Sequence, residues 1–117
     1  MIFHLALRDE WREAVDRGGP YERSTLGKSL AEVGFIHCSF AAQVASTAEL
    51  FYRGRDDVVL LTIDESALEL RVEDGFPHIY GPLPLDAVVD VTPIGSTLLM
   101  PPAVAASTDR RGALPRQ

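Results

Sequence analysis

The chain has 117 residues, of which 46% are hydrophobic and 24% charged, and its net charge at pH 7 is −6. These values are those of one globular domain, and no apolar run approaches the ~20 residues that a membrane-spanning helix needs. The single cysteine, Cys38, excludes an intramolecular disulfide and a thiolate metal site.

The acidic charge argues against a nucleic-acid partner. The tail from Pro101 onward carries three arginines against one aspartate, so residues 1–100 carry a net charge of −8. Nucleic-acid binders gather basic residues on one face, because phosphate contacts supply most of their affinity. Here the basic residues are scattered, so we expect no DNA partner and no RNA partner. The first residues lack the pattern of a secretory signal, and we therefore expect a cytoplasmic protein without a membrane partner.

The chain begins with a predicted strand and helix. Residues 2–7 form a short apolar run, and residues 8–17 show helical spacing until the sequence Gly-Gly-Pro ends the pattern. Trp11 lies on the apolar stripe of this helix, so we expect it to anchor the helix in the core. Residues 18–33 are polar and rich in turn formers, which indicates a surface loop with weak helical potential near its end.

A second helix is expected in the middle of the chain. It follows a short strand over 34–38, and Ser39 is its expected N-cap. The helix ends at Gly54, and its apolar stripe is Phe40, Val44, Ala48 and Phe51. Residues 58–63 are a continuous apolar run, which predicts a central strand buried on both faces.

Strands dominate the rest of the chain. Alternation predicts strands over 68–73, 76–81 and 87–92, after which we expect a turn at Pro93. Residues 101–117 show no periodicity, so we expect a disordered tail. The elements together predict an α+β fold.

All three histidines, His4, His37 and His78, fall in predicted strands. Because residues i and i+2 share a face, His37 lies on the side of Ser39 and His78 on the side of Tyr80. Each histidine alone is more simply explained as a hydrogen-bonded packing residue. Together, imidazoles, a hydroxyl and a phenol indicate one wall of a small-molecule site, provided that the strands lie in neighbouring or facing sheets.

Two further side chains have a simple packing explanation. Tyr52 lies near the apolar stripe of its helix, where core packing and ligand stacking are equally consistent with the pattern. Cys38 points away from His37 in a regular strand, so we expect a small buried hydrophobe and no Cys-His pair.

Four separated blocks of the sequence carry a family resemblance: residues 2–11, 34–39, 53–64 and 76–88. In this order they resemble the bacterial domain-of-unknown-function family 952, over about residues 1–93. That family resembles in turn the ADP-ribosyltransferase fold, a split antiparallel β-sandwich with helices that grips NAD between its two sheets. The resemblance implies an ADP-ribosyltransferase-like domain over residues 1–100 with two main helices. It implies no assigned activity.

Within that fold the chain is similar to the RNA 2′-phosphotransferases, in which a His-x-Ser strand end, a helix and an apolar strand ending in Asp follow one another as residues 37–64 do here. This likeness implies catalytic roles for His37 and His78 and NAD contacts for four other residues. These four are His4, Ser39, Tyr52 and Tyr80.

Two departures weaken the enzymatic reading. Transferases of this fold place a glutamate on a late strand, where this chain has His78 and Tyr80, with Glu73 expected in the preceding turn. The phosphotransferases also hold the phosphate with arginines, and here only Arg53 or Arg55 is near a candidate position.

Three hypotheses follow. The first is an NAD- or nucleotide-using transferase or hydrolase, and the second is a non-catalytic small-molecule-binding module on the same fold, which the missing glutamate favours. The third is a metal site made by the three histidines. It ranks last, because no short-range ligand pair supports it, and we therefore expect no metal. The sequence leaves the choice between binding and turnover, and the oligomeric state, open.

Overall fold

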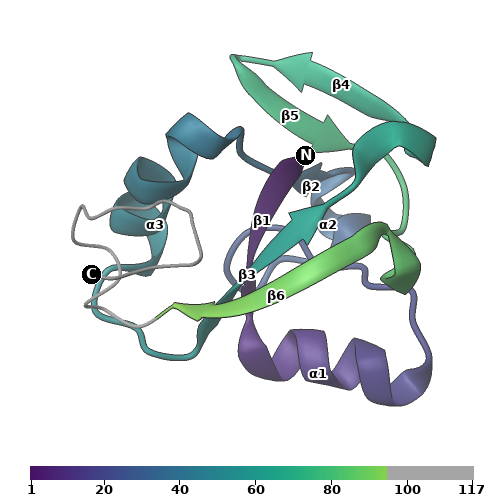
Figure 1. The fold of residues 1–117 in the computed structure, drawn as a ribbon, viewed down its shortest axis with the longest axis horizontal. Coiled ribbons are helices and arrows are strands. Elements are labelled where there is room, and N and C mark those ends of the chain that lie inside the picture. The colour runs from purple at the N-terminus through teal and green to yellow at the C-terminus, as the bar shows by residue number, and fades with distance from the viewer. Residues whose placement is uncertain (95–117) are drawn as a thin grey trace.

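Two three-stranded antiparallel sheets and two main helices make up the fold (Figure 1). The computed structural model describes residues 1–94. Its helices are Arg8–Arg17 (α1), Leu30–Val33 (α2) and Val44–Tyr52 (α3), and its strands are Ile2–Leu7 (β1), Ile36–His37 (β2), Val58–Ile63 (β3), Leu70–Glu73 (β4), Phe76–Ile79 (β5) and Val88–Ile94 (β6). The prediction of an α+β fold with antiparallel sheets and two main helices is confirmed.

The first sheet has the order β1-β3-β6. The apolar run over 58–63 forms the central strand, as its sequence predicts, and Leu61 and Ile63 are fully buried. The predicted turn at Pro93 is wrong, because β6 continues through Pro93 to Ile94. β6 lies at the edge of the sheet, where the missing N–H of a proline need not interrupt the hydrogen bonds between strands.

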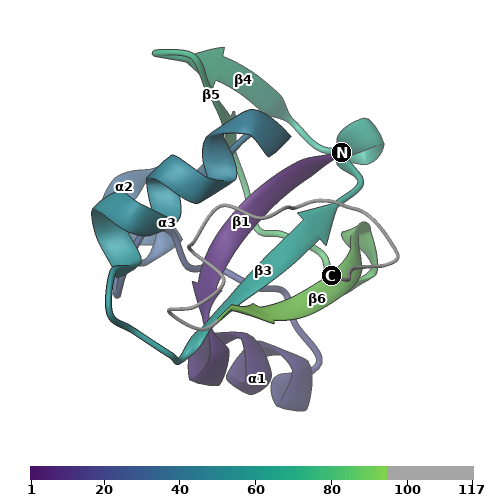
Figure 2. The same cartoon turned by 60° about the vertical axis from the view of Figure 1, so that its left-hand side comes forward.

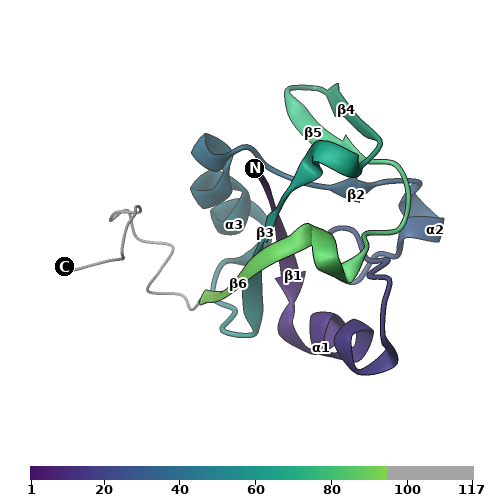
Figure 3. The ribbon, with the colours of Figure 1, turned by 45° about the vertical axis from the view of Figure 1, so that its right-hand side comes forward.

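The second sheet has the order β2-β5-β4, and β4 and β5 form a hairpin. Figure 3 shows this sheet at one end of the molecule, with α1 at the other. Asp74 and Gly75 close the hairpin with φ of 55° and 82°, and two-residue hairpin turns favour such positive values. This turn sets the register, in which Glu73 lies opposite Phe76 and Arg71 lies opposite His78.

Helix α3 lies beside β1 (Figure 2) and buries Thr47, Ala48 and Tyr52. The predicted apolar stripe is wrong in part, because Phe40 and Phe51 are 37% and 42% exposed. The predicted N-cap is also wrong. Ser39 is still extended and exchanges two backbone hydrogen bonds with Phe3, so the chain turns only at a 3₁₀ helix, Ala41–Gln43, which leads into α3.

Helix α1 follows β1 directly and ends at Gly18, which has a left-handed conformation. Ala14 on its inner face is buried, and Trp11 packs against the main core with its ring centroid 5.7 Å from that of Tyr21. Trp11 therefore contacts the core as expected.

Within residues 1–94, no helix is both long enough and apolar enough to cross a bilayer. The predicted tail over 101–117 lies outside the described residues. The cytoplasmic location and the boundary of the domain at residue 100 stay predictions.

The hairpin turn provides a stability test. A Cβ at Gly75 would meet no atom within 4 Å, so Gly75→Ala changes only the backbone strain of the left-handed position. We expect a loss of about 1 kcal/mol in the free energy of unfolding, measured by urea denaturation. Gly75→Asn should lose less, because asparagine tolerates this conformation. Equal losses in the two variants would contradict the assignment of the turn.

Candidate functional site

Five aromatic side chains, which we call the ring cluster, lie together on one face of the β2-β5-β4 sheet: Phe35, His37, Phe76, His78 and Tyr80. Strand alternation explains how they gather. Residues 35 and 37, just before and within β2, point the same way, as do residues 76 and 78 of β5 and residue 80 just after it. The register places His37 directly opposite His78, so both sets face the same side of the sheet.

The rings of the cluster touch one another. The imidazoles of His37 and His78 have their centroids 5.4 Å apart. Phe35 stacks on His78 at 4.1 Å with an interplanar angle of 9°, and Phe76 lies 5.0 Å from His37. His78 is only 7% exposed, whereas the other four rings are partly exposed. The cluster therefore offers ring surfaces and ring nitrogens at the edge of the protein.

A carboxylate from the neighbouring strand joins the cluster. Oε1 of Glu73 accepts a hydrogen bond from Nδ1 of His78 at 2.9 Å and another from the hydroxyl of Tyr80. The expectation that Glu73 lies in a turn is wrong, because it is the last residue of β4. The dipeptide Asp74-Gly75 between two strand patterns is the signal that locates Glu73, since a two-residue hairpin turn pairs residue 73 with residue 76.

A cation from β4 also joins the cluster. The guanidinium of Arg71 lies over the ring of Tyr80, 4.6 Å from its centroid, and pairs with Glu69 at 3.2 Å. Arg71 shares a strand face with Glu73, two residues away, and its side chain is exposed. It brings a positive charge to a cluster whose carboxylate is already engaged.

Hydrogen bonds and burial together define the charge state of three side chains in and beside the cluster near neutral pH. Those donated by Tyr80 and His78 lower the pKa of Glu73, so its side chain is an ionised carboxylate. The bond to this carboxylate raises the pKa of Tyr80, which stays a protonated phenol. Burial and then the neighbouring His78 lower the pKa of His37, so His37 is neutral.

Three ring nitrogens of the cluster lack a hydrogen-bond partner within the described part of the chain. They are Nε2 of His78 and both ring nitrogens of His37, although the backbone N–H of His37 is bonded to Ser24. Buried polar atoms are nearly always hydrogen-bonded in proteins. Nε2 of His78 is therefore open to a hydrogen bond with another molecule.

His4 lies in the interior, away from the ring cluster. Its Nδ1 donates to the backbone carbonyl of His37 at 2.7 Å, and its Nε2 lies 3.0 Å from the hydroxyl of Tyr21. His4 and Tyr21 are 2% and 0% exposed. Both ring nitrogens of His4 thus have protein partners, and burial lowers its pKa from 6.5 to about 4, so it remains neutral.

Ser39 and Tyr52 are also held inside the protein. The hydroxyl of Ser39 donates to that of Thr47 at 3.3 Å. The hydroxyl of Tyr52 accepts from the backbone N–H of Leu26 at 2.9 Å and donates to the carbonyl of Leu5 at 3.3 Å. Of the six candidates from the sequence, the structure brings together His37, His78 and Tyr80, and it places the other three among core hydrogen bonds.

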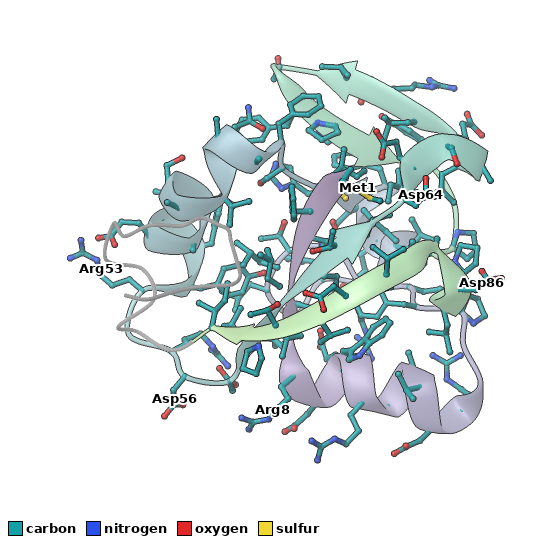
Figure 4. All side chains as sticks on the ribbon, in the orientation of Figure 1. Met1, Arg8, Arg53, Asp56, Asp64 and Asp86 are labelled. Atoms are coloured by element: carbon teal, nitrogen blue, oxygen red, sulfur yellow. The ribbon has the colours of Figure 1, made fainter. Side chains whose placement is uncertain are left out.

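The other candidates from the sequence lie apart from the cluster. In Figure 4, Arg53 and Asp56 lie at the far end of α3 from the β4–β5 hairpin. Arg53 pairs with Glu49, and Arg55 pairs with Asp57 at 2.7 Å. Across residues 1–94, no three His, Cys, Asp or Glu side chains are placed to hold a metal ion, and the three imidazoles do not converge. Cys38 is 1% exposed, as expected for a small buried hydrophobe.

Comparisons with known proteins point to a single family. The model of the family "Protein of unknown function (DUF952)" matches residues 5–91. A crystal structure of a double mutant of protein CC0527 from Caulobacter crescentus is 30% identical, with a TM-score of 0.67, and the match covers 79% of this chain and 83% of that one. The crystal structure of CC0527 itself has a TM-score of 0.65 with the same identity and coverage. Its solution structure has a TM-score of 0.62 at 30% identity, covering 80% and 84%. No curated protein matches the sequence.

The buried His4 makes stability depend on pH. Its pKa is lower in the folded protein than in the unfolded chain, so the unfolded chain binds the extra proton first. The contribution of neutral His4 to the free energy of unfolding is complete above pH 6.5 and is lost as the pH falls toward about 4. Over this range the free energy of unfolding falls by up to about 1.4 kcal/mol per pH unit. Urea denaturation between pH 4 and pH 7 measures this slope.

The control is the double variant His4→Phe, Tyr21→Phe, which removes both members of the buried side-chain hydrogen bond. It also removes the His4 donor to the carbonyl of His37, a loss that does not depend on pH. We expect a shallower fall in stability between pH 6.5 and 4 than in the wild type. An unchanged slope would show that His4 does not titrate in this way.

Proposed function

The chain belongs to the DUF952 family of proteins of unknown function, and we propose that its ring cluster is a nucleotide-binding site, with NAD as the expected ligand. The observation that carries this proposal is the pair of neighbouring imidazoles, His37 and His78, whose remaining nitrogens have no protein partner. Packing alone does not account for such a pair, because the same chain satisfies both nitrogens of its other histidine, His4.

The side chains of the cluster match the parts of a nucleotide. Partly exposed rings such as Phe76 and Tyr80 provide surfaces on which a flat heterocycle stacks. The imidazoles offer hydrogen bonds to sugar hydroxyls or to a carboxamide. Arg71, at the rim, supplies a positive charge for a phosphate in a molecule that is otherwise acidic.

The fold is compatible with a nucleotide ligand but does not place it. Two three-stranded antiparallel sheets are consistent with the resemblance to the ADP-ribosyltransferase fold, in which NAD is held between two sheets. Here the ring cluster lies on the opposite face of the β2-β5-β4 sheet from Ile36 and Ile79, which pack into the main core. In that fold the cleaved bond joins nicotinamide to its ribose, and cleavage passes through an oxocarbenium-like state. Such a reaction needs a stacked leaving ring and hydrogen bonds that strengthen as charge develops, and aromatic rings and imidazoles supply both.

The second candidate function is binding without turnover. One observation favours it: Glu73, the carboxylate within the cluster, already accepts bonds from His78 and Tyr80. It is therefore not free to orient the ribose hydroxyls, as the late-strand glutamate of these transferases does. An assay for nicotinamide release separates the two functions, because only the enzyme forms nicotinamide from NAD.

We expect NAD to raise the melting temperature of the wild-type protein, since a ligand that binds only the folded state stabilises it. His37→Ala should weaken NAD binding by about tenfold, the effect of losing one hydrogen bond and a ring contact. Thermal shift over a series of NAD concentrations measures both effects.

The matched control is Val72→Ala. Val72 lies on the same hairpin but points to the opposite face of the sheet and is 58% exposed. This variant should bind NAD as the wild type does. A nucleotide series of NAD, ADP-ribose and AMP that leaves the wild-type melting temperature unchanged would refute the proposed function.

A further inference from the structure

We infer that Glu73 is a positioning residue that makes Nε2 of His78 a hydrogen-bond acceptor, so that the ligand of the ring cluster must present a donor to it, and we assign that donor to a hydroxyl by comparison with His4. This inference rests on the proposed function, and it narrows the ligand to one with a free hydroxyl, as the ribose of a nucleotide has. It assigns the specificity of the site to a carboxylate that acts through His78.

The first step concerns the proton on Nδ1 of His78. An ionised carboxylate only accepts hydrogen bonds. Because Nδ1 lies 2.9 Å from Oε1 of Glu73, Nδ1 carries the proton. In its neutral form the imidazole has one proton, so with that proton on Nδ1 its Nε2 holds a lone pair and accepts.

The second step comes from His4, which has the same arrangement. Its Nδ1 donates to a carbonyl oxygen, that of His37, and its Nε2 accepts from the hydroxyl of Tyr21 at 3.0 Å. His4 thus shows that, in this protein, a hydroxyl donates to Nε2 of a histidine whose proton is on Nδ1. Nε2 of His78 has no such partner among residues 1–94, and we assign that place to a ligand hydroxyl.

The third step concerns why Glu73 holds this tautomer firmly. The same oxygen, Oε1, also accepts a hydrogen bond from the hydroxyl of Tyr80, so two donors point at it. The ionised carboxylate has no proton to donate to Nδ1 of His78. Phe35, stacked on the imidazole at 4.1 Å, restricts rotation of the ring that would exchange the two nitrogens. The tautomer and the orientation of His78 are therefore fixed before a ligand arrives.

The first test uses long-range ¹H–¹⁵N NMR on the free protein. We expect His78 to carry its proton on Nδ1 in the wild type and in Tyr80→Phe, which keeps the carboxylate. Glu73→Ala should give a mixture of tautomers. Glu69→Ala, which removes a carboxylate that comes just before β4 and pairs with Arg71, should leave the tautomer of His78 unchanged. A wild-type His78 protonated on Nε2 would overturn the inference without any variant.

The second test uses calorimetry with NAD and with two NAD analogues, each lacking both hydroxyls of one ribose. We expect Glu73→Ala to bind NAD about tenfold more weakly than the wild type and Val72→Ala, on the opposite face of the same strand, to bind it equally well. One of the analogues should bind the wild type at least about tenfold more weakly than NAD does. On Glu73→Ala its affinity should differ much less from that of NAD.

The outcomes separate the two proposals. If the wild type binds NAD and both analogues equally, or if Glu73→Ala keeps full affinity, the requirement for a hydroxyl is wrong and the nucleotide site stands. If the wild type binds no NAD, the nucleotide site is wrong, and the NMR result alone decides whether Glu73 positions His78.

Discussion

The hydrogen bond from His78 to Glu73 links the fold of this protein to its chemistry. It exists because Asp74 and Gly75 close a two-residue turn, which brings the last residue of β4 beside the side chains of β5. Without that register, His78 would be a buried imidazole with no fixed proton. With it, one nitrogen is committed to the protein and the other is left for a partner.

The protein uses its histidines in two ways that share one local chemistry. His4 joins a carbonyl of β2 to Tyr21 and so connects the first strand, the second sheet and the loop after α1 through one buried ring. His78 has the same protonation pattern with one partner missing. The contrast separates a histidine that stabilises the fold from one that is available to a ligand, although both are less than 10% exposed.

Strand alternation predicts the site in part. It places His37, His78 and Tyr80 correctly on shared faces, and the structure brings them together because β2 and β5 are neighbours. It does not reveal which sheet a strand joins, so it cannot show that His4 on β1 points into the core.

Two other differences between the expectations from the sequence and the structure have local causes. Ser39 is held by a backbone bridge to β1 and so cannot cap α3. Tyr52, one turn after the buried Ala48, points inward and donates to the carbonyl of Leu5. The role of Glu73 follows from the hairpin turn, whose register depends on a dipeptide and not on hydrophobic spacing. The elements themselves are predictable because their apolar periods are strong, as in the central strand β3.

An NAD titration followed through the imidazole nitrogens of all three histidines provides the decisive measurement. We predict that the resonances of His78 Nε2 and of the His37 ring shift with saturable dependence on NAD, whereas those of His4 stay in place as an internal reference. Shifts confined to His4, or no shift at any of the three rings, would show that the ring cluster is not where a nucleotide binds.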